Sequence, residues 1–216
     1  MSDARKLFAA GLLLLVVAIP ASARIPGRYG VRGGVNLSAF SGEFGDLIGP
    51  QPRVAPNVSF VYEYDFVPGL AFHAEAGWSG KGGQVSSEGT DQAGNSTGRI
   101  TNQWRFEYLE VPLLVRTRMP AAGNVTPFLE LGPSFGIKLS GRFETHPRVI
   151  ESVELGDDMK PLDIGFGAGG GIEFRAGPGR LGVEARYTRG FSDLFDVAGN
   201  AESINQAWTI ALAYTR

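Results

Sequence analysis

The sequence predicts an all-β chain whose strands form one eight-stranded, antiparallel, up-and-down barrel. Three observations indicate this fold. From residue 29 onward, apolar and polar residues alternate with a period of two, which is typical of strands with one apolar face. Glycine accounts for 31 of the 216 residues, and a glycine-rich chain is a poor helix former. The connections between the alternating segments are long and short in turn, as expected when neighbouring strands run up and down.

Each alternating segment is a candidate strand, and most are about ten residues long. In chain order they cover residues 29–37, 57–64, 70–78, 108–116, 129–138, 162–175, 181–188 and 208–215. Representative apolar-face residues, one from each segment in turn, are Val31, Phe60, Phe72, Val111, Leu131, Ile164, Val183 and Ile210. Their immediate neighbours in the chain are mostly polar, charged or small, so every segment has two distinct faces.

The connections favour one arrangement of these strands. Long polar stretches follow the first, third, fifth and seventh segments, at 41–53, 80–102, 141–160 and 190–205. Short links follow the second, fourth and sixth, at 65–69, 120–124 and 176–179. An even number of strands with long loops at one end and tight turns at the other is the pattern of a barrel that spans an outer membrane. A soluble sandwich or a lipocalin-like barrel would alternate in the same way, so other features must decide.

The distribution of charge and aromatic residues favours the membrane. The polar face carries five basic and seven acidic residues, namely Arg32, Glu63, Glu75, Glu110, Arg116, Glu130, Lys138, Asp163, Glu173, Arg175, Glu184 and Arg186. In lipid these charges must point inward, whereas in a soluble barrel they would face water. Aromatic residues gather near strand ends on the apolar face, at Tyr62, Tyr64, Trp78, Tyr187, Trp208 and Tyr214. Those positions match the aromatic girdles of a transmembrane barrel.

The inward charges define the candidate site, which is structural rather than catalytic. An isolated charge is costly in a narrow, poorly hydrated space, so opposite charges on neighbouring strands should pair. We therefore expect a charge network in the lumen formed by Arg32, Glu75, Glu110, Arg116, Glu130, Lys138, Glu173, Glu184 and Arg186. Such a network would close the bore, because eight strands leave an interior just wide enough for side chains.

Residues 1–23 have the pattern of a cleaved secretory signal peptide. Arg5 and Lys6 precede an apolar run at 7–19, and Ala21-Ser22-Ala23 forms a site of small residues for cleavage. The run is too short to span a bilayer, which takes about 20 apolar residues. We expect the mature protein to begin at Arg24 and residues 24–216 to form a single outer-membrane barrel domain. No later run is apolar enough for a transmembrane helix.

Several segments resemble the outer-membrane β-barrel domains of Gram-negative bacteria known as PorT-like or "porin family" domains. They are residues 30–37 (GVRGGVNL), 108–114 (YLEVPLL), 127–136 (PFLELGPSFG), 165–174 (GFGAGGGIEF) and 182–190 (GVEARYTRG). The resemblance extends over residues 29–214. It implies location in the cell outer membrane, contact with outer-membrane lipid and lipopolysaccharide, and assembly with the help of periplasmic chaperones and the barrel assembly machinery.

Motifs that would indicate an enzyme or a cofactor are weak. Residues 165–170 match G-x-G-x-x-G, but the alternation continues through them and no helix follows, as a dinucleotide site would require. His73 and Glu75 share the inward face. An interior histidine bonded to a neighbouring carboxylate is commoner than a hydrolase dyad or a metal site. His146 lies in a long polar stretch, and the chain has no cysteine. We therefore expect no catalytic residue, cofactor or metal.

The remaining question is what such a barrel does. A net charge of −2 argues against binding nucleic acid over a broad basic surface. The favoured interpretation is a non-enzymatic structural or interaction protein that displays long external loops, with a protein partner reached through those loops. The alternative is a narrow channel or an accessory of a secretion or transport apparatus. Weaker alternatives are an outer-membrane hydrolase and a soluble lipocalin-like ligand binder. The acidic loops could bind divalent cations, although ordinary solvated loops are the simpler interpretation.

Overall fold

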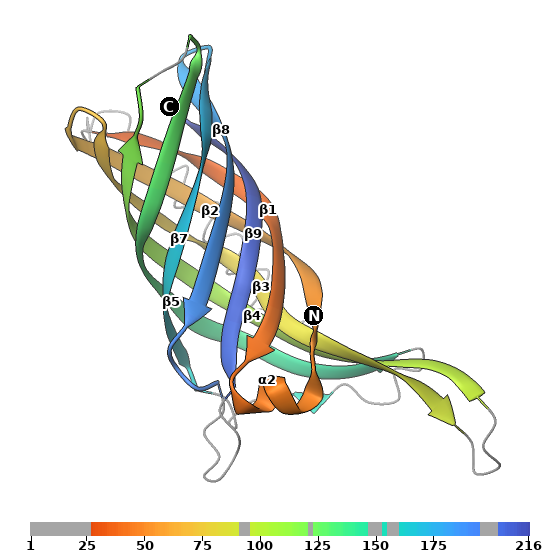
Figure 1. Ribbon diagram of the computed structural model, residues 1–216. Coiled ribbons are helices and arrows are strands. Elements are labelled where there is room, and N and C mark those ends of the chain that lie inside the picture. Colours follow the sequence, from red (N-terminus) through yellow and green to blue (C-terminus); the bar gives the residue numbers. More distant parts are fainter. Residues whose placement is uncertain (1–26, 91–95, 121–122, 147–152, 155–159, 195–202) are drawn as a thin grey trace, which may run out of the picture.

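The computed structural model describes residues 27–90, 96–120, 123–146, 153–154, 160–194 and 203–216 (Figure 1). The expected signal peptide lies outside these residues. The strands and one short helix are β1 (Arg28–Ser41), α2 (Glu43–Ile48), β2 (Gln51–Val67), β3 (Leu70–Thr90), β4 (Ser96–Arg118), β5 (Val125–His146), β6 (Val153–Glu154), β7 (Leu162–Ala176), β8 (Gly179–Gly190) and β9 (Ile204–Thr215). Within the described residues, no helix is long and apolar enough to cross a membrane.

Eight of the strands close into a ring in which every neighbour is antiparallel. Each pairs with the next along the chain, from β1 to β5 and then through β7, β8 and β9. The ring closes where β9 pairs with β1, from Gly30 opposite Thr215 to Ser41 opposite Ile204. The two-residue strand β6 pairs only with β5 and lies outside the ring. The predicted eight-stranded, up-and-down barrel is therefore confirmed.

The two ends of the barrel differ as the sequence predicts. At one end, which we call the turn end, β2 joins β3 at Pro68-Gly69 and β7 joins β8 at Gly177-Pro178. Gly69 and Gly177 have φ of 81° and 60°, a backbone conformation that glycine adopts without steric cost. The opposite end, which we call the loop end, carries α2 and the long connections (Figure 1).

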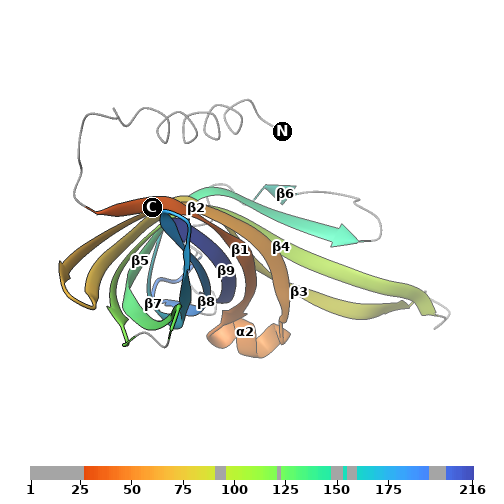
Figure 2. The ribbon, with the colours of Figure 1, turned by 90° about the horizontal axis from the view of Figure 1, so that it is seen from above.

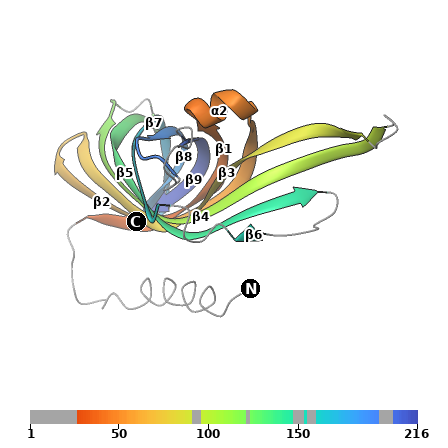
Figure 3. The same cartoon turned by 90° about the horizontal axis from the view of Figure 1, so that it is seen from below.

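Two of the predicted long loops contain strand. The expected loop at 80–102 is wrong over most of its length, because β3 and β4 stay paired out to Gly89 opposite Gly98. The expected loop at 141–160 is wrong at 141–146, because β5 runs to His146, whereas 147–152 and 155–159 lie outside the described residues. Most of the paired residues there are polar, as in the Ser86–Thr101 hydrogen bond of 3.0 Å. Apolar residues such as Ile100 and Trp104 are separated on their own face by the polar Asn102, so this segment lacks the regular apolar alternation that marks the other strands. We call the paired residues 84–90, 96–105 and 141–146 the extension. It projects sideways from the barrel (Figures 2 and 3).

The wall of the barrel is apolar outside and charged inside. Val31, Leu131 and Leu212 are 54%, 54% and 58% exposed on the outer face, whereas Arg186 and Glu130 are buried on the inner face. This is the reverse of a soluble protein and matches a barrel whose outer wall meets lipid. Aromatic side chains on the outer face lie near both ends of the strands, with Tyr29, Tyr64 and Tyr214 at the turn end and Tyr187 and Trp208 at the loop end.

The glycines of β7 make room inside this narrow barrel. A Cβ atom added at Gly169 would lie 2.5 Å from Ala185 O and 2.8 Å from Arg186 Cα, and one at Gly171 would lie 2.1 Å from Val183 O. Residues 165–170 continue as strand, as the sequence predicts, and the inward glycines among them leave space for Arg186 within the lumen.

A charge placed on the outer wall should destabilise the barrel if that wall faces lipid. We expect Leu131→Arg to lower the free energy of unfolding by about 2–4 kcal/mol, the usual cost of arginine near the bilayer midplane. The measurement is urea-induced unfolding of protein refolded into lipid vesicles. Ser87→Arg, at an exposed position of the extension, is the control and should cost little. Equal costs at the two positions would contradict the membrane orientation.

Candidate functional site: the charged lumen

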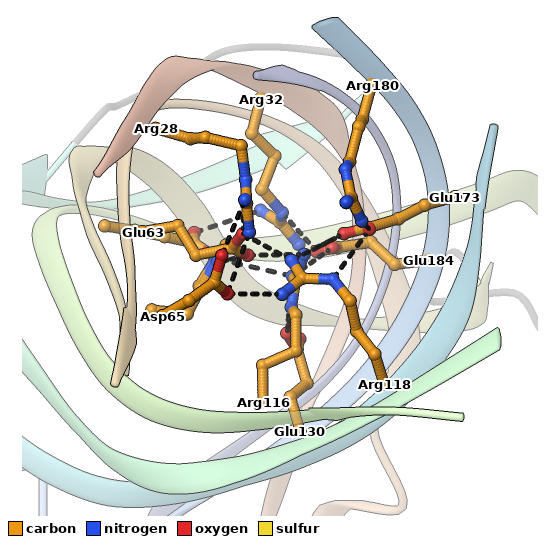
Figure 4. A network of polar contacts seen from close by, with 12 residues as sticks. Arg28, Arg32, Glu63, Asp65, Arg116, Arg118, Glu130, Glu173, Arg180 and Glu184 are labelled. Atoms are coloured by element: carbon orange, nitrogen blue, oxygen red, sulfur yellow. Dashed lines mark hydrogen bonds and ion pairs between the residues drawn. The ribbon is translucent and has the colours of Figure 1, made fainter. Parts of the chain in front are cut away.

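The turn-end half of the lumen is filled by charged side chains from seven of the eight ring strands (Figure 4). We call this group the lumen cluster. Its members are Arg28, Arg32, Glu63, Asp65, His73, Glu75, Arg116, Arg118, Glu130, Glu173, Arg180, Glu184 and Arg186. The alternation of each strand places these residues on the inner face, and the ring brings together side chains that are far apart in the sequence.

Arg116 of β4 lies at the centre of the lumen cluster. Its Nη2 is 2.6 Å from Glu130 Oε2 and 3.0 Å from Glu184 Oε2. Its Nη1 is 3.1 Å from Glu173 Oε1 and 3.4 Å from Glu63 Oε2. One guanidinium thus links β4 to four other strands, which the five donors of arginine make feasible and a lysine ammonium would not.

A second arginine joins the same carboxylates from the other side. Arg186 Nη2 lies 2.5 Å from Glu75 Oε1, 2.6 Å from Glu130 Oε1 and 3.2 Å from Glu184 Oε1. Arg32 Nε donates to Glu184 Oε1 at 2.5 Å. Because each carboxylate here receives hydrogen bonds or ion pairs from more than one strand, the contacts form a continuous network rather than isolated pairs.

The network continues to the turn end of the lumen. Arg28 and Arg118 both form ion pairs with Glu63. Their guanidinium groups also lie 2.6 Å and 2.9 Å from the Asp65 carboxylate. Arg118 Nε donates to Glu173 Oε2 at 2.9 Å, which ties this outer layer to the centre of the cluster. The bore is therefore filled by paired charges up to the level of the turns.

His73 is held between two carboxylates in the described part of the lumen. Its Nδ1 lies 3.3 Å from Glu63 Oε2 and its Nε2 lies 3.0 Å from Glu75 Oε1, with the side chain fully buried. Arg116 Nη2 is 3.4 Å from the same Nε2. None of these described contacts is a hydroxyl that the imidazole could activate as a nucleophile. His146 lies at the end of β5, 3.7 Å from Glu144, remote from the lumen.

A layer of neutral polar groups follows the lumen cluster toward the loop end. Asn36 donates to Ser79 Oγ at 2.9 Å and accepts hydrogen bonds from Asn57 and Thr209 at 2.9 and 2.7 Å. A cavity of about 20 Å³ lies between this layer and the cluster. The buried Arg32 Nη2 has no protein partner and borders it. The cavity has room for about one water molecule.

Apolar residues close the loop end of the lumen. Phe40, Phe106, Tyr108 and Leu194 form a buried cluster, and Trp104 packs against it. The Phe40 ring lies 5.7 Å from the Phe106 ring and 5.9 Å from the Trp104 ring. The lumen is thus filled along its length, first by paired charges, then by neutral polar groups and finally by aromatic side chains.

The structure brings together most, but not all, of the predicted network. Seven of the nine predicted residues lie in the lumen cluster, namely Arg32, Glu75, Arg116, Glu130, Glu173, Glu184 and Arg186. Glu110 instead forms a separate ion pair with Lys81 at 2.8 Å, which lies beside the neutral polar layer. Lys138 lies half-buried farther along β5, opposite Tyr108 in the register.

Six members of the cluster were not in the predicted network. Two of them, Glu63 and His73, were predicted only to face inward. Arg28, Asp65, Arg118 and Arg180 lie just beyond the predicted ends of their strands, although each shares the parity of an inward residue such as Arg32 or Glu184. Continuing the alternation by a few residues would have found them. Arg175 also shares this parity, yet it is exposed where β7 meets its turn. Within the described residues, no group of acidic and histidine side chains is arranged to hold a metal ion.

These features together define an integral membrane barrel with a packed, charged interior. The chain belongs to the family described as "Outer membrane protein beta-barrel domain", whose model matches residues 22–196. The protein is accordingly an outer-membrane protein, which confirms the predicted location and the family resemblance at this level; the PorT-like assignment stays a prediction.

Solved structures of similar fold are distant in sequence. Neisserial surface protein A (NspA) is 9% identical, with a TM-score of 0.46 over 86% of this chain and 95% of its own. Ail, the attachment invasion locus protein of Yersinia pestis, solved with the heparin analogue sucrose octasulfate, is 13% identical, with a TM-score of 0.42 over 89% and 100%. OprG from Pseudomonas aeruginosa is 12% identical, with a TM-score of 0.39 over 88% and 96%. No curated protein sequence matches the chain.

Removing the central arginine should destabilise the barrel strongly. We expect Arg116→Met to lower the free energy of unfolding by about 3–5 kcal/mol, because it leaves buried carboxylates without one of their counter-charges. Urea-induced unfolding in lipid vesicles provides the measurement. The control is Arg105→Gln, which breaks the exposed Arg105–Glu144 pair and should cost about 0–1 kcal/mol. A loss for Arg116→Met no larger than that of the control would show that the lumen cluster does not brace the barrel.

Proposed function

We propose that the protein is a closed, non-conducting barrel that holds an extracellular interaction surface, formed by the extension. The observation that carries this proposal is the continuation of β3, β4 and β5 beyond the ring as a paired sheet (Figures 1 and 2). Outer-membrane barrels have short turns on the periplasmic side and long connections outside. The extension is then extracellular. On this proposal, periplasmic chaperones and the barrel assembly machinery act during biogenesis and lipopolysaccharide surrounds the folded barrel.

One face of the extension is suited to contact with a protein. Val85, Ile100, Trp104 and Phe143 share the face that continues the lumen wall, and all four are half-buried. The Trp104 and Phe143 rings lie 5.1 Å apart, so the stripe joins the apolar cluster at the mouth of the lumen. Aromatic residues surrounded by polar groups are the usual composition of an interface core and its rim.

The opposite face of the extension is polar and carries balanced charge. Gln84 and Gln103 are hydrogen-bonded across the strands at 3.2 Å, and Arg105 Nη1 lies 2.9 Å from Glu144 Oε2. Partial burial opposes ionisation of Glu144, but the hydrogen bond from Arg105 outweighs it and holds the pKa of that carboxyl below its usual range. One face of the extension is therefore apolar and the other is polar and charged, so a partner that binds through apolar contacts would recognise the first.

The edge of the extension offers backbone groups as well. The pairing of β2 with β3 ends at Gln51 opposite Gln84, so in the described part of the chain no strand covers β3 beyond that point. An uncovered strand edge is a template for β-augmentation by an extended segment of another protein. Backbone hydrogen bonds at this edge and side-chain contacts on the apolar stripe would act together in one interface.

The filled lumen argues against the alternative of a narrow channel. We expect the purified protein to give no steady open-pore conductance in planar bilayers, because ions would have to cross paired charges, a one-water cavity and an aromatic plug. A general-diffusion porin inserted under the same conditions is the positive control. Steady, large conductance steps from the unmodified protein would replace this proposal with a channel.

Site-specific crosslinking tests the extension directly. We expect a photo-reactive residue at Val85 to form a discrete crosslinked species with a protein on intact cells, because Val85 lies on both the uncovered edge and the apolar face. The same residue at Val183, on the outer wall of the barrel, is the matched control and should crosslink lipid. Crosslinks to protein at Val183 but none at Val85 would contradict an interface on the extension.

A further inference from the structure

The outer wall of the barrel has a hollow near the loop end. Its volume is about 350 Å³, and it lies across β1, β2, β8 and β9. The residues around it are Leu37, Ala39, Pro52, Tyr187, Gln206, Ala207 and Trp208. All of them except the buried Ala207 occupy outward positions of their strands, so the hollow opens toward the membrane rather than toward the lumen.

The hollow results from small side chains beside large ones. Ala39 lies opposite Gln206 in the ladder between β1 and β9, two residues beyond Leu37, which lies opposite Trp208. The Tyr187 and Trp208 rings contact each other at 5.2 Å. The Tyr187 hydroxyl donates to Gln206 Oε1 at 2.9 Å, which fixes that amide and leaves its Nε2 as a donor at the hollow.

A positive charge lies at the loop-end side of the hollow. Arg189 is opposite Gln206 in the ladder between β8 and β9 and shares the outward face of Tyr187. Its side chain is exposed, and it forms no ion pair with the described residues. The aromatic residues Tyr187 and Trp208 mark the level of the membrane interface, so the guanidinium lies where lipid headgroups begin.

We propose that this hollow binds one anionic lipid of the outer leaflet, with an acyl chain along Ala39 and Trp208 and a phosphate on Arg189 and Gln206. A hollow in a lipid-facing wall must be filled, and an acyl chain is the apolar group available there. Guanidinium is matched to phosphate in geometry and charge, and the neighbouring amide adds a further donor. The proposal depends on the outer-membrane location of the barrel and not on the role of the extension.

Quenching of Trp208 fluorescence by brominated acyl chains tests the site. The background variant carries Trp78→Phe and Trp104→Phe, which leaves Trp208 as the only tryptophan. Nanodiscs of phosphatidylcholine are doped with brominated phosphatidylglycerol or with brominated phosphatidylcholine. We expect half-maximal quenching at a fraction of brominated lipid about fivefold lower for the anionic lipid than for phosphatidylcholine. This is the preference that roughly one basic residue gives at a membrane surface.

Variants separate the two parts of the site. Arg189→Gln should remove the preference for the anionic lipid, and Ala39→Leu should reduce quenching by filling the hollow. The control is Arg175→Gln, which removes another exposed arginine at the turn end and should leave the preference unchanged. If replacement of Trp104 prevents folding, the wild-type protein is compared with Trp208→Phe, so that the difference reports Trp208 alone.

Three outcomes would overturn the proposal. Equal quenching by both lipids would show that the hollow accepts annular lipid without selection. A preference that survives Arg189→Gln would place the anion elsewhere. Loss of the preference when excess inorganic phosphate is added would indicate a simple anion site rather than a lipid site. None of these results bears on whether the barrel conducts or whether the extension binds protein, so failure here is distinguishable from failure of the proposed function.

Discussion

The pairing of charges inside the barrel is the constraint on which the rest of the structure depends. The lumen cluster holds six arginines and six carboxylates, and each carboxylate lies within ion-pair distance of at least two arginines. An unpaired charge in this space would cost several kcal/mol, whereas a shared one is compensated from two directions. Because the paired arginines and carboxylates come from seven strands, the charges are fully paired only when the ring of strands is closed.

Steric fit is as important as charge balance. Arg116 lies over the Phe128 ring, with 4.0 Å between the guanidinium carbon and the ring centroid, so even the flat face of the central arginine is covered. Arg186 reaches the centre past Gly169, where a Cβ atom would collide with the neighbouring strand. Glycines on one strand therefore provide the space that the large charged side chains of the neighbouring strand occupy in the lumen.

Sequence periodicity predicted those aspects of the fold that depend on apolar alternation. It gave the number of ring strands, the inward and outward faces and seven members of the lumen cluster. It did not give the extension, where many paired residues, such as Ser86 with Thr101, are polar and the apolar ones are not regularly alternating. It also missed Arg28 and Arg118, because the predicted strands ended short of them, although both share the parity of the inward residues. Which arginine meets which carboxylate depends on the stagger of the strands around the ring, and periodicity within a strand contains no information about it.

A filled lumen changes where function can be sought in a barrel of this kind. Most charged groups of the described interior are paired with one another, so they offer little to an external ligand. The groups that remain available lie on the outside at the loop end: the apolar stripe and free edge of the extension, and the exposed Arg189 beside a hollow in the wall. The two surfaces face different surroundings, one aqueous and one lipid. A rigid body between them would hold the extension at a fixed height above the membrane, because the same lumen cluster that closes the bore also resists deformation of the ring.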